Sequence, residues 1–398
     1  TVAGLVWQPK WGFLGAWFLA ILAPTSSFIP LPGQTEAEHR MYLPLVAVVA
    51  VAVLPTYWAA GRLGLRSWRA MAALVLGVAA VLGLETYSRN KDYQSELAIW
   101  GDAVRNSPLN DRAYLSRGSA HWTNGQMEEA IKDYDQCIAL NPRYAKAYTG
   151  RGNAYSDLRR YDEALRDYDQ ALKLKPDLAD AYNGRGSIFG YQGQVDAAIR
   201  EFSRAIELDP NFAQAYYNRA NAYDAKGDLD AAIDSYSRAI ALRADHAKAY
   251  NSRGSDYDKK GQIDLAIKDY DEAIAIQPDF VEAYSNRCSA RDVKGQVHAA
   301  IKDCDMAIEL RPDFAEAYIN RGNSLQGKGQ YEAAIKDYDK AIELKPDLTA
   351  AYQNRAMARS QTKAYDKAWA DVRMLRKLGG MPIPSFVEEL TKKSGQSE

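Results

Sequence analysis

The sequence predicts an all-α protein, in which N-terminal transmembrane helices are followed by a right-handed superhelix of helical pairs, an α-solenoid. Two observations predict this architecture. Apolar runs and five of the eight Trp fall in the first 70 of the 398 residues. The rest of the chain is highly charged and repeats itself every 34 residues. The net charge of −1 gives no general affinity for nucleic acid, so we expect no nucleic-acid partner.

The first part, residues 1–86, has the composition of a membrane region. Apolar runs at 11–24, 42–61 and 68–87 predict about three transmembrane helices. The second and third runs, of about 20 residues, span about 30 Å as helices and match a hydrocarbon core. There are two alternatives. The first run could be a cleaved signal peptide, or all three runs could form a buried helical core. Because the chain starts at Thr1 rather than Met, we expect a fragment or a processed chain.

The loops between these runs predict an orientation. The link "GRLGLRSWRA" carries Arg62, Arg66 and Arg69 and no acid, and the positive-inside rule places it in the cytoplasm. The 26–41 loop and everything after Tyr87 then lie on the other side. We therefore expect an integral membrane protein in contact with the lipid bilayer, with its repeats on the extracytoplasmic, periplasmic or lumenal, side.

Residues 113–378 form eight units without an insertion or deletion. "AYLSRGSAHW" at Ala113 recurs as "AYTGRGNAYS" at Ala147, and the series continues to Ala351. The period and the residue pattern resemble the tetratricopeptide repeat, a helix–turn–helix unit. Counted from two residues before each Ala-Tyr, the small residue at position 8, Ala at 20, the aromatic at 24 and Pro at 32 match that family. We interpret 87–112 as a linker helix or half-repeat and 379–398 as a capping helix and tail.

Packing explains these positions. Small residues let two antiparallel helices approach closely, and the aromatic side chain fills the space beside them. Gly at the turn supplies a left-handed conformation in six repeats, whereas Arg159 and Lys363 stand there in two. Pro ends the second helix. One unit cannot bury its apolar face alone, so the units stack and enclose a concave groove.

A charge pattern recurs in phase with the repeat. Position 7 is Arg in all eight units, and position 23, on the facing helix, is an acid in seven, with Ser235 as the exception. One interpretation is a series of arginines that grip an anionic ligand. We favour internal ion pairs and expect Arg219, opposite Ser235, to be free. The arginines are Arg117, Arg151, Arg185, Arg219, Arg253, Arg287, Arg321 and Arg355.

Asparagines recur at the positions that the family resemblance assigns to the concave groove, namely 2, 5, 6, 9, 12 and 13 of the first helix. An Asn amide binds a peptide backbone as donor and acceptor without requiring a sequence. The pattern resembles the Asn ladder of the tetratricopeptide domain in O-GlcNAc transferases, which implies protein or peptide partners; solvated helix surface is the alternative. The candidates are Asn153, Asn183, Asn218, Asn221, Asn251, Asn286, Asn320, Asn323 and Asn354.

The three cysteines carry little functional signal. Cys288 and Cys304 occupy positions 8 and 24 of one repeat, which face each other. A disulfide is permitted outside the cytoplasm, but we expect free thiols that pack as small hydrophobes, as for Cys137. No Cys/His spacing suits a metal, and no nucleotide loop or nucleophile–base pair is present, so we predict no metal and no cofactor.

The charged stretch "SSFIPLPGQTEAEHRMYLP" at 26–44 lies between the first two apolar runs. With the following span and the repeats, it resembles the transmembrane and tetratricopeptide-repeat proteins, glycosyltransferases of the GT-C class that include O-mannosyltransferases. The resemblance implies a lipid-phosphate-linked sugar donor, contacted by Glu38, His39 and Arg40, and an array that binds the acceptor polypeptide. The family's catalytic acid lies in an earlier loop that this chain lacks, so we predict no catalytic residue here.

Two alternatives stay open. The 26–44 loop could serve only as an interfacial anchor against the headgroups. The protein as a whole could be a membrane-tethered scaffold for protein complex assembly, with no chemistry of its own.

Overall fold

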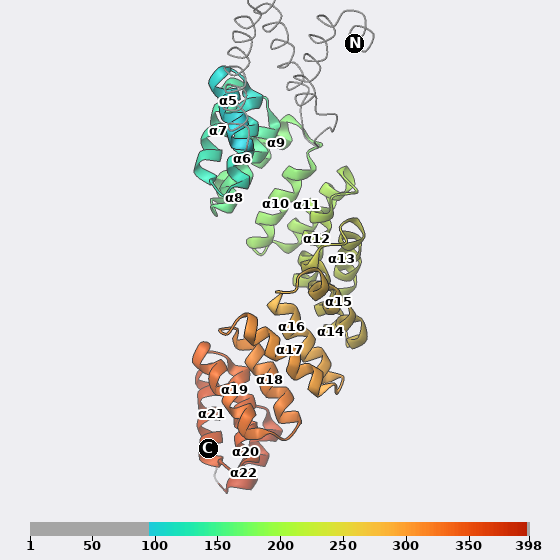
Figure 1. Cartoon of the computed structure of the whole chain (residues 1–398), viewed down its shortest axis with the longest axis vertical. Coiled ribbons are helices and arrows are strands. Elements are labelled where there is room, and N and C mark those ends of the chain that lie inside the picture. Colours follow the sequence, from blue (N-terminus) through green and yellow to red (C-terminus); the bar gives the residue numbers. More distant parts are fainter. Residues whose placement is uncertain (1–94, 396–398) are drawn as a thin grey trace, which may run out of the picture. The chain divides into compact units, whose positions relative to one another are not determined.

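The computed structural model describes residues 95–395, which form eighteen α-helices labelled α5 to α22 (Figure 1). The predicted membrane spans and the 26–44 stretch lie outside the described residues. Within the described part, no helix combines the length and the apolar character that a bilayer span requires. Contacts between helices group Trp100–Glu398 into one unit.

Sixteen of these helices form eight antiparallel pairs, and each pair corresponds to one 34-residue repeat. The first helices of the pairs are α6 (Asp111–Thr123), α8 (Ala145–Asp157), α10 (Ala179–Tyr191), α12 (Ala213–Lys226), α14 (Ala247–Lys259), α16 (Val281–Val293), α18 (Ala315–Gly327) and α20 (Thr349–Gln361). The second helices are α7 (Met127–Leu140), α9 (Tyr161–Leu174), α11 (Val195–Leu208), α13 (Leu229–Leu242), α15 (Ile263–Ile276), α17 (Val297–Leu310), α19 (Tyr331–Leu344) and α21 (Tyr365–Lys377).

Single helices lie before and after the pairs. The helix α5 (Glu96–Asn106) precedes the first repeat, and α22 (Pro384–Ser394) follows the last. Phe386 and Leu390 of α22 are buried against Trp369 and Val372 of α21. The last second helix would otherwise expose this apolar face to water, so α22 closes the C-terminal end of the stack.

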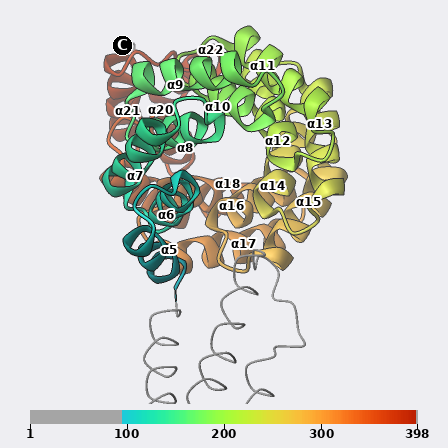
Figure 2. The ribbon, with the colours of Figure 1, turned by 90° about the horizontal axis from the view of Figure 1, so that it is seen from above.

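The two helices of a pair occupy different sides of the array. Except at the two ends of the array, each first helix packs against its own second helix, against the second helix of the preceding repeat and against the first helix of the next. Figure 2 shows α8, α10, α12, α14, α16 and α18 toward the middle of the winding, and α11, α13, α15 and α17 toward its outside. The first helices therefore form the inner surface, as the sequence predicted for the groove.

A buried tyrosine at position 24 joins neighbouring first helices. The Tyr168 ring, 1% exposed, lies against Gly152 of its own repeat and Gly184 of the next. A Cβ atom added at Gly152 would lie 2.9 Å from Tyr168 Cε1, and one added at Gly184 would lie 2.5 Å from Cζ. Both glycines are thus required for the close approach of the helices, and the predicted role of the small residues is confirmed.

The turn between the two helices of a pair adopts a left-handed backbone in every repeat. Six repeats have Gly there, with φ between 71° and 82°. Arg159 and Lys363 adopt the same conformation, at φ of 59° and 62°. For a residue with a Cβ atom this region is less favourable by about 1–2 kcal/mol. Two repeats therefore carry a strained residue at this turn.

The prediction of free thiols at Cys288 and Cys304 is wrong, because the two form a disulfide. Their Cα atoms are 5.6 Å apart across the α16–α17 pair. Six of the other repeats have a small residue and a large ring at these positions, mostly Gly and Tyr, and the backbone spacing that suits this contact also suits two Cys side chains. Cys137 is a buried free thiol, as expected, and burial raises its pKa to about 12.

Seven of the eight repeats contain the predicted ion pair between positions 7 and 23. In each, Nε and Nη2 of the arginine donate to the two oxygens of one carboxylate, as Arg253 does to Asp269 at 2.7 and 2.8 Å. The acid is almost fully buried, with 5% of the Asp269 side chain exposed. The other pairs are Arg117–Asp133, Arg151–Asp167, Arg185–Glu201, Arg287–Asp303, Arg321–Asp337 and Arg355–Asp371.

The arginine also makes an interaction that the sequence analysis did not foresee. In five repeats Nη1 donates to the acid at position 25 of the preceding repeat, at 2.5 to 2.7 Å, as in Arg185–Asp169. One guanidinium therefore links three helices in two repeats. Arg219 is not free, contrary to our expectation: it donates to the hydroxyl groups of Ser235 and Ser203 at 3.3 and 3.5 Å.

Removing one partner of an internal pair should destabilise the array. We expect Asp269→Tyr or Arg253→Leu alone to lower the free energy of unfolding by about 3–5 kcal/mol, because the remaining charge has no counter-ion. The double variant should recover much of that stability, since two apolar side chains replace the pair. Urea unfolding followed by circular dichroism measures the difference. A double variant as unstable as the sum of the two single variants would contradict an internal role.

Candidate functional site

The inner surface of the array is lined by amide side chains that contact one another from repeat to repeat. Asn218 Nδ2 donates to Asn183 Oδ1 at 2.9 Å, and Asn286 Nδ2 donates to Asn251 Oδ1 at 3.1 Å. Each of these hydrogen bonds joins position 6 of one first helix to position 5 of the preceding one. Near the C-terminal end, Asn354 Nδ2 donates to Asn323 Oδ1 at 2.8 Å. Consecutive first helices are thereby held in register along their inner faces.

The buried tyrosines orient a second set of asparagines. The hydroxyl group of Tyr168 donates to Asn153 Oδ1 at 2.7 Å, and that of Tyr236 donates to Asn221 Oδ1 at 2.6 Å. Asn323 Oδ1 accepts from Tyr338 in the same way, at 2.9 Å. The sequence analysis did not foresee that the packing tyrosine also orients the amide above it.

These hydrogen bonds leave a regular set of unused donors and acceptors. In five asparagines the side-chain oxygen accepts a hydrogen bond from a neighbour, and Nδ2 has no partner among the described residues. These five are Asn153, Asn183, Asn221, Asn251 and Asn323. In three others Nδ2 donates a hydrogen bond, and the side-chain oxygen has no partner within residues 95–395. These three are Asn286, Asn320 and Asn354. Asn218 uses both groups, because its oxygen accepts from Gln214. The surface thus offers both donors and acceptors.

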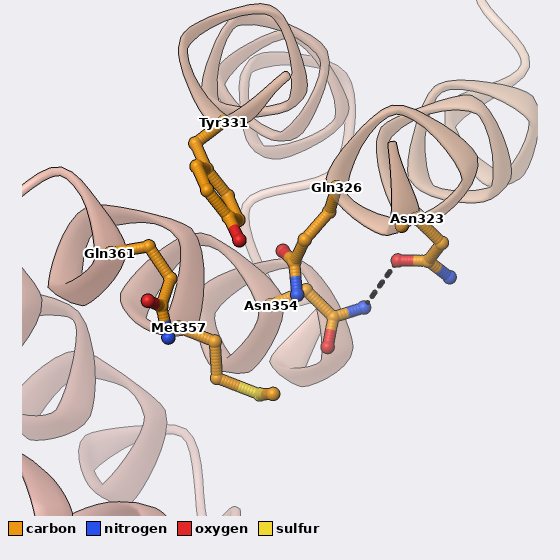
Figure 3. A pocket seen from close by; sticks show the side chains of 7 residues that line it. Asn323, Gln326, Tyr331, Asn354, Met357 and Gln361 are labelled. Carbon is orange, nitrogen blue, oxygen red and sulfur yellow. Dashed lines mark hydrogen bonds between the residues drawn. The ribbon is translucent and has the colours of Figure 1, made fainter. Parts of the chain in front are cut away.

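A pocket of about 420 Å³ opens on this surface between the seventh and eighth repeats. Figure 3 shows the Asn354–Asn323 hydrogen bond on one side, with Met357 and Gln361 of α20 on the other. Gly327 stands at position 13 of α18, where the other repeats have a larger residue, and the missing side chain leaves the space open. The lining residues are Asn323, Gln326, Gly327, Tyr331, Asn354, Met357 and Gln361.

The sequence analysis found two of these lining residues, Asn323 and Asn354, and missed the others. Positions 12 and 13, which the sequence analysis assigned to the groove, hold Gln326, Gly327 and Gln361. These residues were missed because only asparagines were chosen as candidates. Met357 replaces the Asn or Ser that other repeats have at position 9. A search of these positions for any side chain that departs from the repeat pattern would have found it.

A buried carboxyl group lies farther along the array, on α14. The Asp256 side chain is 1% exposed, and its Oδ1 accepts from Lys259 Nζ at 2.9 Å. Lys259 also contacts Asp224 of the preceding first helix. Burial raises the pKa of Asp256 to about 6; the Lys259 ammonium group lowers this pKa, and the negative charge of Asp224 raises it. Within residues 95–395, no three His, Cys, Asp or Glu side chains gather as metal ligands would.

These features define a class, a helical-repeat protein with an amide-lined inner surface, and comparison with known families identifies the repeat. The sequence pattern described as "TPR repeat" matches residues 118–159 and 186–227. The pattern described as "Tetratricopeptide repeat" matches 145–178, 213–246, 247–280 and 315–348. The repeat region is therefore a tetratricopeptide-repeat array, as the resemblance implied. No curated protein matches the chain.

A solved structure gives the same fold. A chain of the APC/C hetero-tetramer Cut9–Hcn1 is 16% identical, with a TM-score of 0.54, over 74% of this chain and 57% of that one. The MamA protein is 31% identical over 43% of this chain and 94% of its own, with a TM-score of 0.39. YrrB, described as a TPR protein with an unusual peptide-binding site, is 26% identical over 46% and 95%, with a TM-score of 0.37. These comparisons give no support to the glycosyltransferase resemblance.

The raised pKa of Asp256 predicts a pH-dependent stability. Between the ordinary pKa of about 4 and the folded value of about 6, the folded state binds more protons than the unfolded state, so this group makes stability fall as pH rises. Asp256→Asn mimics the protonated form. We expect its unfolding midpoint to match that of the wild type near pH 4 and to exceed it increasingly up to pH 7.

The matched control is Asp264→Asn, which removes an exposed carboxylate from α15. Thermal unfolding from pH 4 to pH 8 compares the two variants. The assignment is wrong if Asp256→Asn changes the midpoint equally at all pH values, or if Asp264→Asn reproduces its pH dependence.

Proposed function

We propose that the array binds an extended polypeptide along its inner surface through hydrogen bonds to the peptide backbone. The observation that carries this proposal is the division of the asparagines into donors and acceptors. An extended backbone presents N–H and C=O groups in alternation. Amide groups of both kinds, held by neighbours and repeated along the groove, can pair with such a chain whatever its side chains are.

The pocket between α18 and α20 would add selectivity. The amides of Gln326 and Gln361 and the flexible thioether of Met357 can accommodate a side chain of mixed character. The groove supplies affinity through repeated backbone hydrogen bonds, and the pocket favours particular side chains at one place. This division of roles is common in the recognition of extended peptides.

Backbone recognition has a specific experimental signature. The test uses a peptide that is selected from a random library for binding to this protein. N-methylation of alternate backbone amides of the peptide should weaken binding about tenfold for each hydrogen bond removed. Alanine replacement of peptide side chains that lie outside the pocket should change the affinity little. Asn183→Ala with Asn251→Ala should weaken binding by about 10- to 100-fold. Fluorescence anisotropy measures the dissociation constants.

Gln136→Ala on the exposed face of α7 is the control for the groove variants, and it should bind as the wild type does. Circular dichroism verifies that each variant is folded. Equal affinity of the Asn183→Ala, Asn251→Ala double variant and the wild type would exclude these amides from the site.

We further propose that the array lies on the extracytoplasmic side of a membrane. Two observations support this location. The link with Arg62, Arg66 and Arg69 favours the cytoplasmic side for the segment between the last two predicted spans. The Cys288–Cys304 disulfide is of the kind that persists in oxidising compartments.

Thiol labelling tests this location. The chain has three cysteines, so protein denatured directly from acid-quenched cells should take up one thiol reagent per chain, at Cys137, and three after reduction. Mass spectrometry counts the labels. Cys288→Ser provides the control, because it should add one label, at Cys304, without reduction. Three labels on the unreduced wild-type chain would contradict an oxidising location.

The glycosyltransferase hypothesis is a second proposal, supported by the sequence of 26–44, which lies outside the described residues. In that case the groove would hold the acceptor polypeptide, and Glu38, His39 and Arg40 would contact a lipid-phosphate-linked sugar donor. If the protein is instead a scaffold without catalytic activity, it would bind its partner proteins in the same groove. Transfer of sugar from such a donor to a groove-bound peptide distinguishes the two.

A further inference from the structure

The series of internal ion pairs is interrupted in the fourth repeat. Arg219 of α12 faces Ser235 of α13 where seven other repeats have an acid, and Ser203 of α11 where five others have one. Its Nε and Nη1 atoms donate to the two serine hydroxyl groups at 3.3 and 3.5 Å. No carboxylate among the described residues forms an ion pair with Arg219, so its charge has no internal counter-ion.

The next repeat provides an internal comparison. Arg253 also has a serine, Ser237, at position 25 of the preceding repeat, but Asp269 supplies the counter-ion at position 23. Tyrosine rings flank both arginines at similar distances, 5.4 and 5.9 Å for Arg219 and 5.6 and 5.8 Å for Arg253. The aromatic rings therefore do not compensate specifically for the missing acids at Arg219.

A half-buried guanidinium without a carboxylate is costly, because it gives up hydration without gaining a counter-ion. The serines around it also differ from Ser237. The hydroxyl group of Ser237 donates to the carbonyl oxygen of Ile233 in its own helix, at 2.7 Å. The hydroxyl hydrogens of Ser203 and Ser235 have no such acceptor among the described residues. Arg219 and the two serines thus form a set of hydrogen-bond donors with no negative charge among them.

Ser203, at the outer edge of this site, is partly exposed, whereas Ser235 behind it is 1% exposed. In other repeats, the acid that contacts Nη1 is itself at the surface, with 64% of the Asp169 side chain and 48% of the Asp271 side chain exposed. Ser203 is shorter than Asp and leaves that place unfilled. The second helices α11 and α13 lie toward the outside in Figure 2, away from the amide-lined inner surface.

We propose that Arg219 and Ser203 form a binding site for an oxyanion, a carboxylate or phosphate group carried by a partner protein, because the buried Ser235 leaves Arg219 without an internal counter-ion. The incoming oxygens would take the place of the exposed acid that five other repeats have at position 25, with Arg219 as a planar donor and the Ser203 hydroxyl group as a further donor. The site lies apart from the inner surface, so the array binds this partner independently of a peptide in the groove.

The experiment compares three forms of the full chain in phosphate, glutamate and chloride at equal ionic strength. Phosphate should raise the thermal midpoint of the wild type by about 2–4 °C over chloride. Ser235→Asp restores the acid that seven repeats have. It should raise the midpoint in chloride and abolish the phosphate gain. Ser237→Asp, which adds an acid beside the already paired Arg253, should keep the gain.

The anions separate the two sources of the oxyanion. If both phosphate and glutamate raise the thermal midpoint over chloride, the site accepts a carboxylate-bearing partner as well as a phosphorylated one. If phosphate alone raises it, the partner is phosphorylated. The proposal is overturned if the wild type shows no gain with either anion, or if Ser235→Asp keeps the same gain as the wild type. Removal of the site would leave peptide binding in the groove unchanged.

Discussion

The rest of the array depends on the position of one arginine in each repeat. Its guanidinium group joins the first helix of a repeat to its own second helix and, in five repeats, to the second helix of the preceding repeat. Because the donors are coplanar and fixed in direction, the three helices can satisfy them only in one relative placement. An insertion in either helix would displace the acid from the arginine, and the eight repeats contain none.

The packing that fixes the helices also prepares the inner surface. Tyr168 fills the space above two glycines, and its hydroxyl group then holds the oxygen of Asn153. The amide nitrogen is thereby left to face other partners. Core packing and surface chemistry are coupled through a single side chain, so the hydrogen-bonding groups are ordered before a ligand arrives and less entropy is lost on binding.

Departures from the repeat pattern mark the places where individual repeats differ in role. Cys288 and Cys304 replace a packing contact with a covalent one. Ser203 and Ser235 remove the negative charges around Arg219 while leaving the helices unchanged in length. Met357 changes an inner position from polar to apolar beside the pocket. A regular scaffold can carry such changes because each repeat contacts only its neighbours.

The sequence by itself determined the helix pairs, their period and the pairing of Arg253 with Asp269, because these follow from local pattern and from residues that recur in phase. It also selected the asparagines of the first helices as candidates for the groove. Only the tertiary structure decided which amide atoms are used internally, that Cys288 and Cys304 are bonded, and that the arginines reach the preceding repeat. These depend on distances between side chains of different helices, and a periodic sequence gives the order of such residues but not the separation of their atoms.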